Sequence, residues 1–275
     1  MMAMRLACSN IAWLAEEEAG ALASLRAHGV SGIEVAPTCL WPGWVGASTS
    51  LARSKRLAWA DQGWEVPSMQ ALLFDQPEAR LFGQDDGRLF ERHLARVADL
   101  GMALGAQVAV LGAPRQRQRG DLPLDRAWAQ AIPVMRRVAA VYRDAGMRLA
   151  IEPARPEYGG DFIVNTLEAI AFARAVDHPG LGVHLDAAAM ASAGESIDLL
   201  WSIAREGELL HYQLSQPNLE GFEKPLPSQL FNLDFLVRNN WSGWCSVEMR
   251  RQAQGLDRAG PWALWRAATE GQDDR

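Results

Sequence analysis

Eight short apolar segments alternate with longer segments of helical periodicity, and this alternation restricts the fold more than any other feature of the chain. Such alternation is typical of parallel strands joined by crossover helices. Eight units within 275 residues match a (β/α)8 barrel, which takes about 250 residues. The expected strands are 4–8, 32–36, 65–71, 107–111, 148–152, 182–186, 209–214 and 244–248.

The segments between the expected strands have the periodicity of amphipathic helices. The clearest is 88–104, where apolar residues recur at spacings of three and four with Arg and Asp between them. Glycines close several of these segments, because a residue that tolerates positive φ ends the last turn of a helix. These glycines are Gly29, Gly63, Gly101, Gly105 and Gly146.

The chain contains no linker or change of composition that would divide it. We therefore expect one α/β barrel domain over 1–275, with a disordered tail after about residue 270. The competing fold is an open doubly wound sheet, which usually carries a glycine-rich loop after its first strand. Here that position reads Ser9-Asn10-Ile11-Ala12-Trp13.

Charge and composition exclude several classes of partner. The net charge of −6 and the pI near 5.5 argue against binding to a nucleic-acid backbone. The sequence has no apolar run of about 18 residues and no secretory leader pattern, so we expect no membrane partner. The three cysteines lie far apart without metal-binding spacing, which favours reduced thiols and a cytoplasmic location.

Three acidic residues end expected strands. Glu152, Asp186 and Glu248 follow apolar runs, and strand ends of this kind share one pocket at the C-terminal mouth of a barrel. Converging carboxylates are costly to bury unless they are paired or bind a cation, so the pattern indicates a metal site or a proton-transfer pair. The alternative for each acid is a helix cap or a solvated loop residue.

Other polar residues lie on or beside the same strands. His184 shares a strand face with Asp186, and His211 shares one with Gln213, so both histidines are candidates for substrate binding. The alternative is a hydrogen-bonded histidine in the core.

Arginines follow two of the expected strands. Arg115 and Arg250 are candidates for binding a phosphate or carboxylate of the substrate. Arg117 and Arg119 are expected to be solvated loop residues.

At these residues the sequence resembles the sugar phosphate isomerase/epimerase family of xylose isomerase-like barrels, and the resemblance extends over nearly the whole chain. The motifs that carry it are Gly32-Ile33-Glu34-Val35-Ala36-Pro37-Thr38, Ile151-Glu152-Pro153, Tyr158-Gly159-Gly160-Asp161-Phe162, His184-Leu185-Asp186 and Ser246-Val247-Glu248-Met249. The resemblance implies a divalent cation, manganese or magnesium, held by residues at the ends of strands five to eight. Glu152, Asp186 and Glu248 match three of these ligands.

The chain departs from the family at two positions. The His-x-His pair of strand seven reads His211-Tyr212-Gln213, so Gln213 occupies the position of the fourth ligand. An amide oxygen suits magnesium or manganese but lacks the imidazole nitrogen that later transition metals prefer. The family's Asp-x-x-His motif reads Asp186-Ala187-Ala188-Ala189, which removes a histidine that orients the substrate.

The resemblance implies an isomerase or epimerase of a sugar or sugar-like hydroxy-carbonyl compound. Glu152 and Glu248 would then act as the acid/base pair on opposite faces of the reacting carbon. A dehydratase or lyase that begins with the same proton abstraction is the alternative activity, and a non-catalytic descendant with a decayed metal site is the alternative class. For the oligomeric state, a homodimer is the candidate.

Overall fold

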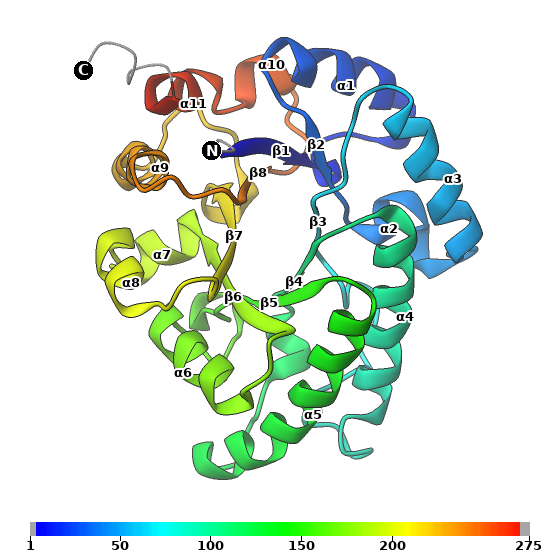
Figure 1. Ribbon diagram of the computed structural model, residues 1–275, viewed down its shortest axis with the longest axis vertical. Coiled ribbons are helices and arrows are strands. Elements are labelled where there is room, and N and C mark those ends of the chain that lie inside the picture. Colours follow the sequence, from blue (N-terminus) through cyan, green and yellow to red (C-terminus); the bar gives the residue numbers. More distant parts are fainter. Residues whose placement is uncertain (1–3, 270–275) are drawn as a thin grey trace.

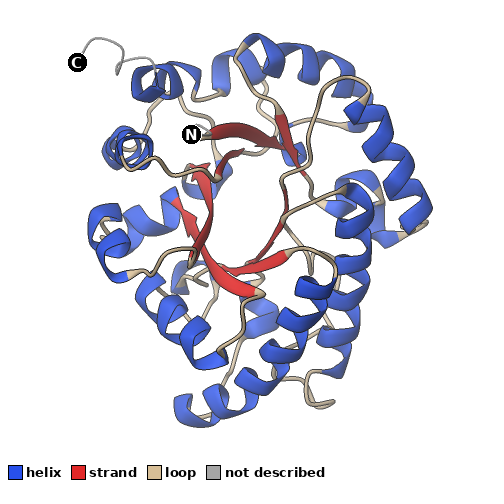
Figure 2. Cartoon of the chain, in the orientation of Figure 1, coloured by secondary structure: helices blue, strands red, loops and turns tan. Residues whose placement is uncertain are grey.

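The computed structural model describes residues 4–269 and has a ring of eight parallel strands with helices around it (Figure 1). The strands form the inner wall and the helices the outer layer (Figure 2). The strands are β1 (Arg5–Ser9), β2 (Gly32–Glu34), β3 (Ser68–Met69), β4 (Val108–Leu111), β5 (Arg148–Ile151), β6 (Leu181–Asp186), β7 (Leu209–Ser215) and β8 (Trp244–Glu248).

The strand order is that of a (β/α)8 barrel, as predicted. Neighbouring strands in the order β2-β1-β8-β7-β6-β5-β4-β3 pair in parallel. Two isolated parallel bridges, Gly32 to Glu65 and Val35 to Met69, join β2 to the chain around β3. The barrel is thus nearly closed, and its C-terminal strand ends face one mouth.

Helices fill the connections between strands. The α-helices are α1 (Glu18–Ala27), α2 (Pro37–Leu40), α3 (Thr49–Ala60), α4 (Arg88–Leu104), α5 (Leu124–Asp144), α6 (Thr166–Val176), α7 (Ala187–Ala193), α8 (Ile197–Ile203), α9 (Pro227–Arg238), α10 (Leu256–Ala259) and α11 (Trp262–Thr269). The predicted helix 88–104 is confirmed as α4, which buries Phe90, Leu94 and Val97.

Two local predictions were wrong. The expected strand 65–71 shortens to Ser68–Met69, because the chain turns at Ala71, whose φ is 54°. Gly101 does not end a helix but lies inside α4, where an added Cβ would come within 2.6 Å of Met147 and 2.9 Å of Met69. A close approach of α4 to the barrel, not a turn, therefore requires this glycine.

Within 4–269, no helix combines the length and apolarity that crossing a bilayer requires. The tail after residue 270, expected to be disordered, lies outside the described residues.

Candidate active site

A cavity of about 290 Å³ opens at the C-terminal ends of the strands. Glu152 directly follows β5, Asp186 ends β6 and Glu248 ends β8, and all three line this cavity together with Ser215 at the end of β7. The order of the strands places Asp186 between the two glutamates. The alternation of apolar strand residues with a terminal acid therefore brings three acids from distant parts of the sequence to one cavity.

Burial and mutual repulsion hold these acids toward their neutral forms. Burial, followed by the charges of Asp186 and Glu34, raises the pKa of Glu152 to about 8, although the positive charge of Arg117 lowers it. Burial, Asp186 and Glu152 raise the pKa of Glu248 well above its ordinary value. Burial also raises the pKa of Asp186. Such a group of acids can bind a cation or exchange protons near neutral pH.

Asp186 also caps a helix. Its Oδ1 accepts a hydrogen bond of 2.7 Å from the backbone N–H of Ala189 in the first turn of α7. Its Oδ2 accepts one of 2.5 Å from the hydroxyl of Ser215. The capping role considered for strand-end acids thus holds for Asp186, although the same carboxylate lines the cavity. These bonds fix its orientation, and each oxygen keeps a further lone pair.

Arg117 and Gly112 position Glu152 from the loop after β4. Arg117 donates hydrogen bonds to the carbonyl of Gly112 at 2.5 Å and to that of Glu152 at 2.6 Å. The expectation of a solvated Arg117 was wrong: its side chain is fully buried, and burial lowers its pKa to about 10. The guanidinium joins the ends of β4 and β5, where backbone carbonyls would otherwise lack partners.

Gln213 lies in β7 and is buried, but it is not among the residues that line the cavity. Its Nε2 donates a 2.7 Å hydrogen bond to Oε1 of Glu34, a fully buried residue at the end of β2. Ser68 donates to the other oxygen of Glu34 at 2.8 Å. Burial raises the pKa of Glu34 to about 7, although both hydrogen bonds favour its charged form.

Sequence reasoning did not single out Glu34, the buried acid that Gln213 contacts. The signal was present, because an acid between Ile33 and Val35 in an apolar strand is rarely left in a core without a specific role.

His184 and His211 lie in the same buried layer below the cavity. Their Nδ1 atoms are 3.2 Å apart, and their rings stack with centroids 5.2 Å apart. Burial lowers the pKa of His211 to about 3 and, helped by His211, that of His184 well below its ordinary value. Both rings are therefore neutral, and neither lines the cavity.

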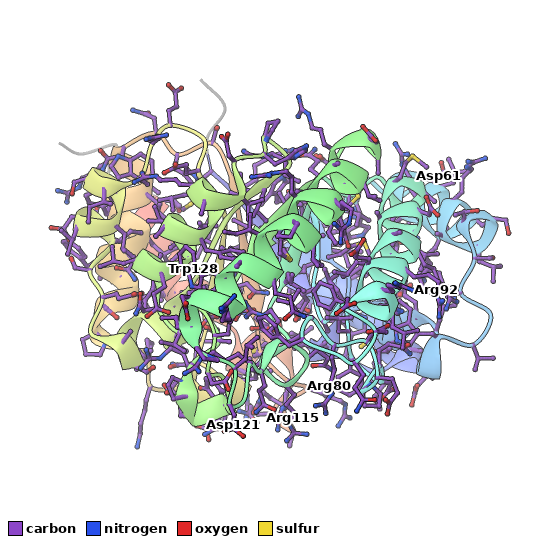
Figure 3. The ribbon with its side chains drawn as sticks, turned by 90° about the horizontal axis from the view of Figure 1, so that it is seen from below. Asp61, Arg80, Arg92, Arg115, Asp121 and Trp128 are labelled. Atoms are coloured by element: carbon purple, nitrogen blue, oxygen red, sulfur yellow. The ribbon has the colours of Figure 1, made fainter. Side chains whose placement is uncertain are left out.

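The two candidate arginines lie in different environments. Arg250 lines the cavity and is otherwise exposed. Arg115 is exposed, does not line the cavity, and lies at the lower edge of the molecule in the view of Figure 3. Of the two, Arg250 lines the cavity, and Arg115 follows the lining residue Pro114.

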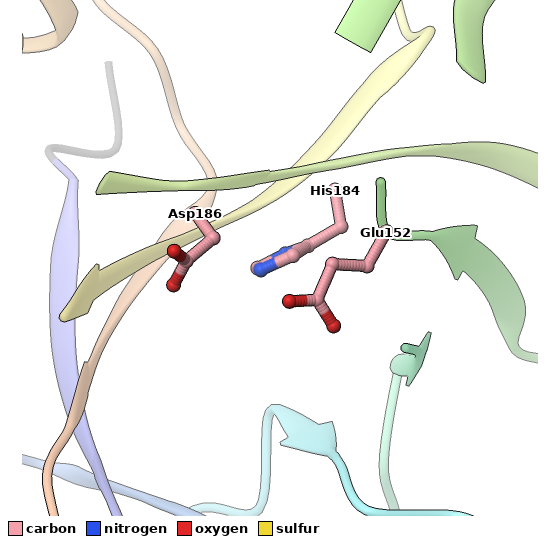
Figure 4. A group of neighbouring side chains, drawn as sticks. All are labelled: Glu152, His184 and Asp186. Carbon is pink, nitrogen blue, oxygen red and sulfur yellow. The ribbon is translucent and has the colours of Figure 1, made fainter. Parts of the chain in front are cut away.

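Glu152, His184 and Asp186 form a group that could hold a metal ion. One ligand atom from each lies within 4.8 Å of those of the others, and Figure 4 shows the three side chains pointing toward one another. Two carboxylates and an imidazole suit a divalent cation such as manganese. Glu248 lines the same cavity, whereas Gln213, predicted as a fourth ligand, does not line it.

A parallel barrel whose strand ends carry converging acids defines a class of proteins with one site at the barrel mouth. The xylose isomerase-like TIM barrel family matches residues 22–268. The chain therefore belongs to this family, as the motifs predicted. No curated protein matches the chain.

Solved structures share the fold at low sequence identity. An L-ribulose 3-epimerase superposes with a TM-score of 0.72 at 16% identity, covering 91% of this chain and 82% of its own. A D-psicose 3-epimerase from Clostridium cellulolyticum, with D-tagatose, gives 0.73 at 17%, covering 98% and 93%. A 3-keto-D-glucoside 4-epimerase from E. coli gives 0.74 at 16%, covering 96% and 97%.

Gly112→Ala is expected to disturb the site directly. A Cβ at this position would lie 2.3 Å from Oε2 of Glu152, so the carboxylate must move away. We expect overpacking to lower the free energy of unfolding by about 1–3 kcal/mol and manganese binding to weaken. Urea denaturation and calorimetric titration measure the two effects.

The matched control is Gly20→Ala in α1, where an added Cβ meets nothing within 4 Å. This exposed helical position should gain up to about 1 kcal/mol. Manganese affinity that is the same in both variants would contradict the role of Gly112.

Proposed function

We propose that the protein is a sugar epimerase or isomerase that moves a proton at the carbon next to a carbonyl group. One observation carries the proposal: Glu152 and Glu248 line the same cavity from β5 and β8, with Asp186 between them and with raised pKa values. A carboxyl group that changes protonation near neutral pH is suited to exchange a proton with carbon. The epimerase names of the three structural neighbours support the same reaction class.

A divalent cation, manganese or magnesium, would be held by Glu152, Asp186 and Glu248, with the amide oxygen of Gln213 as the fourth candidate. When bound, the cation would polarise the carbonyl and stabilise the negative charge that develops on its oxygen. Glu152 and Glu248 would remove and return the proton from opposite faces of the carbon. Ser215 and the N–H of Ala189 would keep Asp186 in place.

Arg250 would bind the end of the substrate that lies away from the reacting carbon. Arg250 lines the cavity and is exposed, whereas Arg155, which also lines it, is half-buried. A hydroxyl, carboxylate or phosphate of a bound sugar could therefore contact Arg250. His184 and His211, predicted from the sequence to bind substrate, lie in the buried layer below the cavity and do not line it.

The proposal is tested with ketose substrates in deuterium oxide and added manganese. D-Fructose, D-tagatose, D-psicose and L-ribulose form the panel, because the names of the neighbouring structures include these sugars. We expect one of them to incorporate deuterium at the carbon that inverts, observed by NMR. Loss of water from the sugar would indicate a dehydratase instead, and cleavage of its carbon chain would indicate a lyase. The absence of exchange across ketoses, their phosphates and keto-glucosides would reject the proposal.

Gln213→His is expected to raise manganese affinity at least about tenfold. A histidine here can donate one ring N–H to Glu34, as the amide does now, and turn its second nitrogen toward the cation. Carboxylate–histidine–metal arrangements of this kind are common because the carboxylate fixes the tautomer of the ring. Calorimetric titration of both forms checks the result, and equal affinities would contradict it.

A further inference from the structure

A chain of three buried side chains, Glu34, His211 and His184, runs beneath the cavity. Nε2 of His211 lies 3.3 Å from Oε2 of Glu34, and Nδ1 of His211 lies 3.2 Å from Nδ1 of His184. All three side chains are at most 1% exposed. This row of side chains leads from Glu34 at the end of β2, through His211 in β7, to His184 in β6.

The positions of the hydrogens in this chain follow from its acceptors. Glu34 already accepts hydrogen bonds from Gln213 and Ser68, and an ionised carboxylate can only accept. Nε2 of His211 lies 3.3 Å from this carboxylate without the geometry of a hydrogen bond, and the negative charge of Glu34 favours the tautomer with its hydrogen on Nε2. In that tautomer Nδ1 of His211 has a lone pair. That lone pair accepts from Nδ1–H of His184. Because the ring of His184 is neutral, its Nε2 is left without a hydrogen.

This nitrogen of His184 has no partner. Within the described residues, Nε2 of His184 is buried and makes no hydrogen bond. Nε2 of His211 also makes none, and its contact with Glu34 is an ion-pair distance of 3.3 Å. The ring contributes a ligand atom within 4.8 Å of carboxylate oxygens of Glu152 and Asp186, and it points between them in Figure 4. A buried lone pair needs a partner, and a divalent cation held by the two carboxylates would supply one.

We propose that His184 is the nitrogen ligand of a divalent cation shared with Glu152 and Asp186, and that Glu34 and His211 are positioning residues that keep its Nε2 free of hydrogen. His184 would thus supply from β6 the imidazole that Gln213 does not supply from β7. A nitrogen donor favours manganese, cobalt or zinc over magnesium. The inference rests on the cation site of the proposed function, but it does not depend on the substrate.

The tautomers can be read in the wild-type protein without any variant. Two-bond proton–nitrogen NMR spectra are recorded on metal-free protein at a pH above the pKa of Glu34. We expect hydrogen on Nδ1 of His184 and on Nε2 of His211. Diamagnetic zinc should then shift the Nε2 resonance of His184. Hydrogen on Nε2 of His184, or an Nε2 resonance that zinc leaves in place, would overturn the proposal.

Metal titration tests the ligand and the positioning residues separately. We expect His184→Asn to lower manganese affinity at least about tenfold, and Glu34→Gln and His211→Asn to lower it about tenfold through the orientation of His184. Magnesium affinity should fall less than manganese affinity in His184→Asn, because magnesium prefers oxygen ligands.

The matched control is His93→Asn in α4. His93 is also a buried histidine, but its ring bonds to the carbonyl of Leu72. It should leave manganese affinity unchanged. If His184→Asn bound manganese as tightly as this control, the proposal would fail.

The two proposals fail separately. If no sugar exchanged deuterium while His184→Asn still lost manganese, the proposed function would be rejected and the ligand assignment kept. If a sugar exchanged deuterium but His184→Asn left manganese affinity unchanged, the ligand assignment would be rejected and the proposed function kept.

Discussion

Glu152→Gln and Glu248→Gln are each expected to reduce turnover at least about 100-fold while the fold remains intact. Glutamine keeps the volume and one oxygen of glutamate, but it cannot carry a proton between substrate and solvent. Both glutamates line the cavity, and burial raises the pKa of each, to about 8 for Glu152 and well above its ordinary value for Glu248. Deuterium exchange into the substrate measures the proton transfer itself.

Asp186→Asn is the informative comparison for these two variants. An asparagine can still cap α7 through its side-chain oxygen, so the fold should survive. Because Asp186 is assigned only to cation binding, excess manganese should partly restore activity. Excess manganese should not restore either glutamine variant. Exchange at the wild-type rate in both glutamine variants would mean that neither glutamate is the base.

Arg117→Met is expected to lower the free energy of unfolding by roughly 3 kcal/mol. Methionine fills much of the buried space but leaves the carbonyl groups of Gly112 and Glu152 without their donors. Buried carbonyls without partners are destabilising, and these two lie at the ends of adjacent strands. Urea denaturation of the metal-free protein measures the effect.

Arg115→Met is the matched control for this prediction. Arg115 belongs to the same loop but is exposed, so its loss should change the free energy of unfolding by no more than about 0.5 kcal/mol. Equal stability of the two methionine variants would show that the buried hydrogen bonds of Arg117 contribute nothing.

The two arginines also show where reasoning from sequence ends. Arg115 and Arg117 stand two positions apart in one polar loop, and nothing in their local sequence separates them. Arg117 is buried because the 3-10 turn Pro114–Arg117 brings its guanidinium to the carbonyl of Glu152, which lies 35 positions further along the chain. Such a contact depends on the pairing of β4 with β5, not on a local pattern.

By itself, the sequence determined the barrel and the three acids of the cavity. Periodicity is a local property, so the strands and α4 could be predicted, and parallel strands carry their terminal residues to one mouth. Tertiary structure alone decided the partners of those residues. Gln213 meets Glu34 across 179 positions, and His184 meets His211 across 27. The orientation of a buried polar side chain follows from the donors and acceptors around it, and these come from strands distant in the sequence.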